Sequence, residues 1–80
     1  MEKFAQLHET EKGQILVTKE YDDHNDDYLL TIWFPVGNAL GKAEVKITSE
    51  ENANKVLEEY SDIEKLKSTI NAIIPKNYQL

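Results

Sequence analysis

The chain has 80 residues, of which 40% are hydrophobic and 30% charged, and its formal net charge is −6. A chain of this length supports one small domain, residues 1–80, with a modest core that dimerisation would help to stabilise. The absence of cysteine excludes disulfides, a thiolate nucleophile and a cysteine-ligated zinc site. All nine basic residues are lysine, and the absence of arginine argues against direct nucleic-acid binding.

The N-terminus lacks an apolar signal segment, and no run approaches the roughly 18 apolar residues of a membrane span. We therefore expect a cytoplasmic protein with no membrane contact.

Four segments show the alternation of apolar and polar side chains that is typical of β-strands. Segments 4–10 and 14–21 flank a three-residue loop, in which Gly13 suits the left-handed position. Segment 28–36 is apolar on both faces, which predicts a central strand. Segment 43–47 follows turn-rich residues and is apolar on one face only.

Two short helices follow the strands. Thr48 with Glu51, and then Ser61 with Glu64, have the spacing of capping boxes. Each pair precedes an apolar stripe, and Pro75 ends the second helix. The predicted fold class is therefore α+β, a four-stranded antiparallel β-meander followed by two C-terminal helices packed on one face of the sheet.

The strand register decides which side chains share a face. We expect Thr10 opposite Gln14, Tyr21 opposite Tyr28, and Val36 opposite Ala43. The face under the helices then carries two rows, Leu7, Val17, Ile32 and Ile47, and beside them Glu9, Ile15, Phe34 and Val45.

The same register predicts an apolar outer face centred on Trp33. One interpretation is structural, with the stem of Lys46 lying over the indole. The other is a patch for self-association or partner binding, because aromatic residues are enriched in interface cores. The candidate interface residues are Phe4, His8, Leu16, Leu29, Trp33 and Lys46.

Residues 21–28 are the densest polar run. Asp23, Asn25 and Asp27 have the spacing of calcium-loop ligands, but Tyr28 replaces the turn glycine and Phe34 the bidentate glutamate. His24 could join a transition-metal site, although a lone loop histidine is more often a titrating surface group. We predict a solvated hairpin loop, with no metal and no cofactor.

No catalytic arrangement emerges. His8 stands alone on a strand, and Ser49 and Ser61 are better explained as helix-start residues than as nucleophiles. Gly37 and Gly41 precede a strand rather than a helix, so they form no phosphate-binding loop. We predict that the protein is not an enzyme.

Acidic residues cluster at 20–27 and along the first helix. Such a region keeps a protein soluble, and it can also mimic nucleic acid toward a basic protein. An acidic nucleic-acid-mimic inhibitor of a basic nucleic-acid-binding protein is therefore the alternative function. The leading hypothesis is a noncatalytic module, a homodimer or the binder of another protein, that uses the outer sheet face.

The first hairpin also carries a family resemblance. Phe4, Leu7 and Glu9-Thr10, followed by Gly13-Gln14-Ile15-Leu16-Val17, resemble the start of small uncharacterised proteins carried on bacterial integron gene cassettes and related mobile elements. The resemblance covers this hairpin alone. It implies a bacterial accessory protein with a β-meander and C-terminal helices, and no functional residues carry over from it.

Overall fold

Four antiparallel strands form the sheet of the computed structural model, which describes residues 4–80. The strands are β1 (Phe4–Thr10), β2 (Gly13–Asp22), β3 (Asp27–Val36) and β4 (Ala39–Ile47). They lie side by side in the order β1-β2-β3-β4, so each hairpin joins spatial neighbours. The predicted meander is confirmed.

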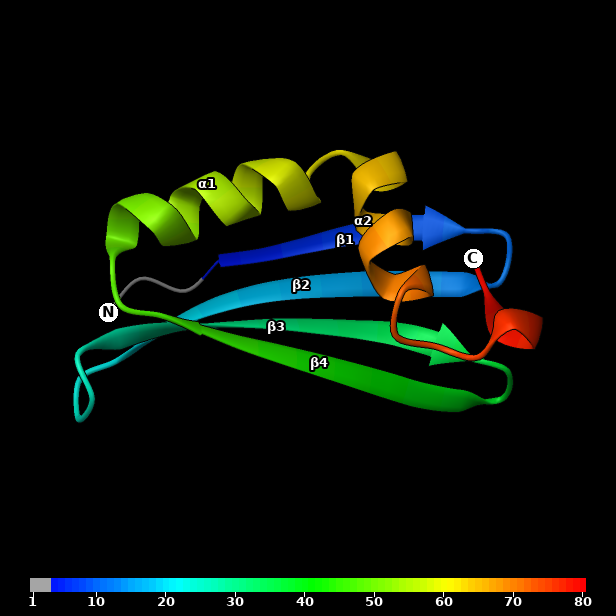
Figure 1. Cartoon of the computed structure of the whole chain (residues 1–80), viewed down its shortest axis with the longest axis horizontal. Coiled ribbons are helices and arrows are strands. Elements are labelled where there is room, and N and C mark those ends of the chain that lie inside the picture. The colour runs from blue at the N-terminus through cyan, green and yellow to red at the C-terminus, as the bar shows by residue number, and fades with distance from the viewer. Residues whose placement is uncertain (1–3) are drawn as a thin grey trace.

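Two helices and a short 3-10 helix complete the described chain. They are α1 (Glu50–Tyr60), α2 (Ile63–Asn71) and η1 (Lys76–Tyr78). Both α-helices lie on the same face of the sheet (Figure 1), which we call the inner face, and the α+β prediction is confirmed. Of the helices within residues 4–80, none is long and apolar enough to cross a membrane.

The helices begin one residue later than the capping boxes predict. Ser49, not Thr48, is the N-cap of α1, and its side chain accepts a hydrogen bond from the backbone N–H of Asn52 at 3.3 Å. Asp62 caps α2 in the same way, while Ser61 follows the last turn of α1. A serine or aspartate oxygen satisfies an N–H group that a helix start leaves without a partner.

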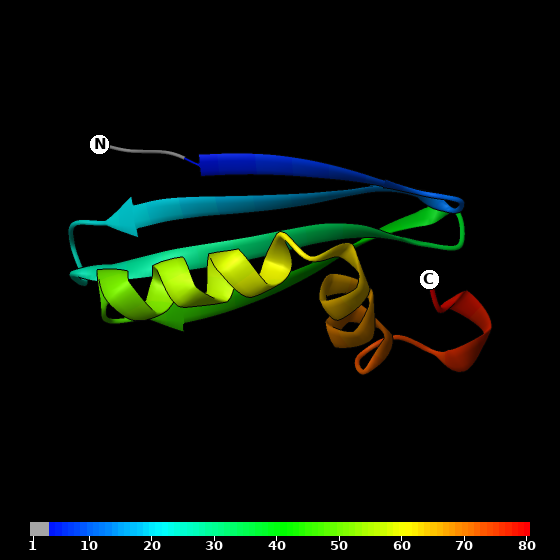
Figure 2. The ribbon, with the colours of Figure 1, turned by 90° about the horizontal axis from the view of Figure 1, so that it is seen from above.

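The core lies between the inner face of the sheet and the apolar stripes of both helices. Burial of each aliphatic side chain contributes about 1.5–3 kcal/mol, so these contacts fix the helices on the sheet. Seen from above, α1 lies over β3 and β4 and leaves β1 uncovered (Figure 2). The buried apolar residues are Ile15, Val17, Leu30, Ile32, Phe34, Ala53, Leu57, Tyr60, Leu66 and Ile70.

The middle hairpin has the predicted register, with Tyr21 opposite Tyr28. The first hairpin does not, because Thr10 lies opposite Gly13 instead of Gln14. Gly13 has a φ of 138° and begins β2, so the connecting loop has two residues and not three.

This one-residue difference reverses the faces of β1. Leu7 and Glu9, expected under the helices, point to the uncovered face, which we call the outer face. Phe4 and His8, expected on the outer face, point inward instead.

The last hairpin differs from prediction by four residues. Val36 lies opposite Ala39 and not opposite Ala43. Gly37, with a φ of 61°, and Asn38 alone form the turn, and β4 begins directly after them. Because the difference is an even number of residues, Ala43 keeps the predicted inner face while its neighbours change.

Gly41 offers a test of this packing. A Cβ atom on Gly41 would lie 2.5 Å from Cε2 of the buried Phe34 and 2.8 Å from Cγ2 of Val36. Gly41→Ala should therefore lower the free energy of unfolding by about 1–3 kcal/mol, measured by urea denaturation. Leu40→Ala, at an adjacent exposed position, should change it by less than about 0.5 kcal/mol. Equal effects of the two substitutions would contradict the packing of β4 on β3.

Candidate functional site

The outer face carries an apolar row that crosses three strands. Leu7, Leu16 and Trp33 lie side by side on β1, β2 and β3. Leu40 of β4 lies in the next row on one side, opposite Pro35, and Leu29 of β3 lies on the other side, beyond the row of Thr31. We call these five residues the outer patch. Neither α1 nor α2 covers it, because both lie on the inner face (Figure 1).

The outer patch extends across the sheet from β1 to β4. Leu7 is 54% exposed and Leu40 67% exposed, at opposite sides of the patch. Leu29 and Trp33 are partly buried by their neighbours. Thr31, which lies between them on the same face, is only 7% exposed although no helix covers it. The side chains of this face therefore pack on one another.

A lysine covers part of the indole. The Nζ atom of Lys42 lies 5.0 Å from the centroid of the Trp33 ring and 2.7 Å from a carboxylate oxygen of Glu44. Such a cation–π contact stabilises by about 0.5–1 kcal/mol at an exposed site. The prediction that Lys46 has this role is wrong, because the changed register places Lys46 opposite Leu29.

The six predicted interface residues divide between the two faces. Those on the outer face are Leu16, Leu29, Trp33 and Lys46. Phe4 and His8 were predicted there wrongly, because the shorter loop turns them inward. Sequence reasoning missed Leu7 and Leu40. Predicting a two-residue loop before Gly13 would have placed Leu7 on the outer face. Predicting a two-residue turn after Val36 would have placed Leu40 there.

The inner side of β1 is incompletely covered. Phe4 is 41% exposed there. Oε1 of Gln6 and Nε2 of His8 are shielded from solvent but have no hydrogen-bond partner within residues 4–80. Buried polar atoms are usually paired, so these two atoms call for an explanation.

The acidic loop is organised by its own side chains. The carboxylate of Asp22 accepts hydrogen bonds from the Asn25 amide at 2.8 Å and the His24 backbone N–H at 3.0 Å. The Asn25 amide, and then the His24 N–H, lower the pKa of Asp22. Asp26, with a φ of 52°, accepts from the hydroxyl of Tyr21 at 2.6 Å. Within residues 4–80 no three His, Asp or Glu side chains are grouped to hold a metal ion.

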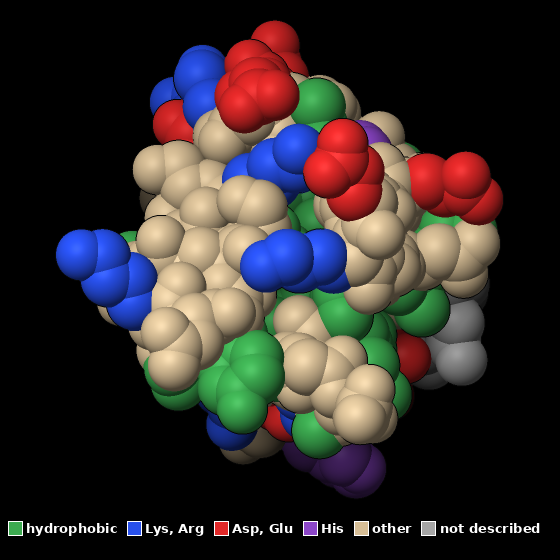
Figure 3. Space-filling view, turned by 90° about the vertical axis from the view of Figure 1, so that its right-hand side faces the viewer, with side chains coloured by type: hydrophobic (Ala, Val, Ile, Leu, Met, Phe, Trp, Pro, Cys, Tyr) green, Lys and Arg blue, Asp and Glu red, His purple; other side chains and the backbone are tan. Residues whose placement is uncertain are grey.

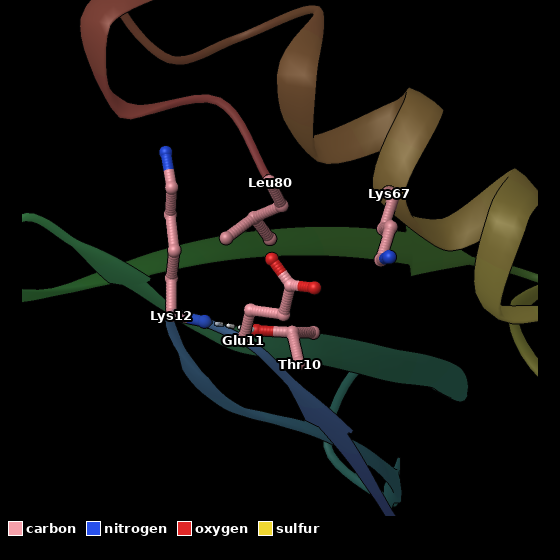
Figure 4. A pocket seen from close by; sticks show the side chains of 5 residues that line it. All are labelled: Thr10, Glu11, Lys12, Lys67 and Leu80. Carbon is pink, nitrogen blue, oxygen red and sulfur yellow. Dashed lines mark hydrogen bonds between the residues drawn. The ribbon is translucent and has the colours of Figure 1, made fainter.

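A small hollow of about 190 Å³ lies where the first hairpin meets α2 and the C-terminal segment. Figure 3 shows this end of the molecule, where lysine and acidic side chains project beside apolar ones. Lys12 Nζ donates to the backbone oxygen of Gln79 at 2.6 Å. The hollow is smaller than the roughly 300–1,000 Å³ of typical ligand sites, and we assign it no ligand. Its lining residues, drawn in Figure 4, are Thr10, Glu11, Lys12, Lys67 and Leu80.

No protein-family model, curated protein or solved structure matches the chain. The resemblance of the first hairpin to integron-cassette proteins therefore stays a prediction, as does the bacterial accessory role that it implies. Function has to be inferred from the outer patch, the edge of β1 and the acidic loop.

The loop generates a pH prediction. The hydrogen bond to Asp26 is the main cause that raises the pKa of Tyr21 from 10.0 to about 12. Asp26→Ala removes the acceptor and its charge, so the pKa of Tyr21 should fall back toward 10, as followed by NMR of the tyrosine ring protons. Asp23→Ala should have a smaller effect, because Asp23 is the weakest of the contributing groups. An unchanged Tyr21 pKa in Asp26→Ala would exclude this hydrogen bond in solution.

The raised pKa of Tyr21 also determines how the stability of the fold changes with pH. A tyrosine that ionises less readily when folded contributes stability that is complete below its unfolded pKa. That contribution is lost as the pH rises from about 10 to about 12. Asp26→Ala should therefore reduce the loss of stability over this alkaline range.

Proposed function

We propose that the chain is a noncatalytic interaction module that self-associates through the outer patch. The observation that carries this proposal is a set of five apolar side chains on a sheet face that α1 and α2 leave uncovered. Contiguous apolar patches on soluble proteins mark interaction sites, with aromatic residues at their centre and charges at their rim. Trp33 and its flanking lysines fit this arrangement.

Charge at the rim favours a second copy as the partner. Glu9 and Glu20 lie on the β1 and β2 side of the outer face, whereas Lys42 and Lys46 lie on β4. Lys42 and Glu44 form an ion pair and offset each other, so the net positive charge of this strand's outer face comes from Lys46. A two-fold axis parallel to the strands places β1 of one copy over β4 of the other. The acidic side of each copy then faces the lysine side of its partner.

The same two-fold axis also brings the apolar residues at the centres of the two outer patches into contact. β3 of one copy lies over β2 of the other, and residues of one row stay level with each other. Trp33 of each copy therefore packs against Leu16 of the second copy, since these residues share a row. Stacked sheets lie about 10 Å apart, with side chains from both faces filling the space. The exposed Lys42 side chain swings aside to admit the contact.

The acidic-mimic alternative lacks comparable support. Carboxylates of Asp22 and Asp26 hold the loop in shape through hydrogen bonds to neighbouring residues. A role in binding a basic protein stays a prediction.

The proposal predicts the effect of a charge at the centre of the patch. Trp33→Lys should weaken self-association at least tenfold, because a desolvated aromatic at an interface centre contributes about 1.4 kcal/mol or more. Sedimentation equilibrium over a range of protein concentrations measures this change, and circular dichroism checks the fold.

Ile73→Lys is the matched control. Ile73 is 60% exposed and lies outside the sheet, so the same added charge should leave association unaltered there. A wild-type chain that stays monomeric at every concentration would refute self-association. Equal weakening by both substitutions would refute the outer patch as its site.

A further inference from the structure

We infer that the free edge of β1 is a second interface, at which the β1 strands of two copies pair antiparallel. The two four-stranded sheets then form one continuous sheet of eight strands. This contact uses the backbone edge and inner side of β1, so it is separate from stacking through the outer patch.

The two edges of the sheet differ in their protection. Charged side chains, lysine above all, blunt an edge strand against pairing with another chain. β4 carries Lys42, Glu44 and Lys46 along its length. In β1 the one carboxylate is Glu9, and the strand has neither lysine nor proline. Figure 2 shows α1 and α2 set over the other side of the sheet, so that the β1 edge is open to approach.

The first hairpin determines which backbone groups face outward. Thr10 and Gly13 flank its two-residue loop, so they occupy a hydrogen-bonding position of the ladder. Bonding positions alternate along a strand. The N–H and C=O groups of Ala5, Leu7 and Glu9 therefore point away from β2, toward a pairing strand.

The length of β1 selects the register. Antiparallel pairing of this seven-residue strand with its copy overlaps completely when Leu7 lies opposite Leu7 of the second copy. Phe4 then lies opposite Thr10, and Ala5 lies opposite Glu9. No two carboxylates of the paired strands face each other, so the register is free of the like-charge contacts that destabilise a sheet.

The same register brings together two of the three buried side-chain atoms that lack a hydrogen-bond partner within residues 4–80, the third being Oδ1 of Asp27. Gln6 lies opposite His8 of the second copy, and the symmetry repeats the pair on the other side of Leu7. Oε1 of Gln6 is an acceptor, and Nε2 of a histidine ring can donate. Within residues 4–80 of a single copy neither atom has a partner, although both are shielded from solvent. Rotation of the Gln6 side chain toward the second copy allows each atom to satisfy the other.

Edge pairing would also extend the apolar row. Leu7 is the outermost member of the row and is 54% exposed in one copy. Placed beside Leu7 of the second copy, it links the two outer patches into one surface. The edge contact thereby enlarges the surface on which stacking acts.

Cross-linking tests this register directly, because the native chain has no cysteine. Gln6→Cys protein is mixed with His8→Cys protein and oxidised mildly. The pairing strands bring these positions to a Cα separation of about 4.5 Å, within disulfide range. Each variant alone places its thiols more than about 7 Å apart. The mixture should therefore give several-fold more covalent dimer than either variant alone, and an equal yield would overturn the inference.

Two proline variants test whether the edge of β1, and not that of β4, forms the contact. Ala5→Pro, introduced into both cysteine variants, removes an outward N–H and should abolish the mixed cross-link. Glu44→Pro, at the equivalent outward position of β4, should preserve it. If circular dichroism shows that Ala5→Pro does not fold, Leu7→Lys replaces it, since two lysines then face each other on the axis. A mixed cross-link that survives the folded β1 variant would overturn the inference.

The cross-link also distinguishes edge pairing from stacking through the outer patch. Both thiols lie on the inner side of the sheet, where stacking of outer faces cannot join them. In a Trp33→Lys background the mixed cross-link should persist, and its loss would overturn β1 as an interface of its own. Association of the wild-type chain without a mixed cross-link would overturn the edge while leaving the outer patch in place.

Discussion

Packing of α1 and α2 on the inner face of the sheet is the contact on which the remaining structure depends. Leu66 and Ile70 of α2 are completely buried with Ile15 and Val17 of β2. The two helices are short, follow the sheet in sequence and occupy one face; seen from above, α1 lies over β3 and β4, and β1 stays clear of both helices (Figure 2). The outer face and the β1 edge are thereby left for contacts that the described chain does not supply to itself.

The sequence is sufficient for the fold class but not for every register. Alternating side chains identify all four strands, and the apolar stripes identify both helices, because these periods reflect burial on one side. Loop length is harder to predict from the sequence, since Gly13 fits either the end of a three-residue loop or the start of a strand. Its placement in β2 moves Leu7 to the outer face and His8 to the inner face. At the last hairpin an even difference leaves the faces unchanged, but it places Lys42 instead of Lys46 beside Trp33 and brings Leu40 into the strand.

These two errors act differently on the candidate site. The centre of the outer patch lies on β2 and β3, whose register the tyrosine pair at the middle hairpin fixes, so Leu16, Leu29 and Trp33 could be predicted. Its margins lie on β1 and β4, where Leu7 and Leu40 depend on the misjudged loops. The unpaired atoms of Gln6 and His8 could not be predicted, because burial of a side-chain atom without a partner depends on the packing around β1 and not on a sequence pattern. The proposed stacking and edge pairing both use surfaces that α1 and α2 leave uncovered.

Trp33 is the only tryptophan of the chain, so its fluorescence reports on the centre of the outer patch without any substitution. The most direct measurement is its emission spectrum during dilution from high to low protein concentration. Self-association through the outer patch predicts a blue-shifted emission at high concentration that moves to longer wavelength as copies separate and water reaches the indole. An emission maximum that stays constant across the dilution would contradict the account.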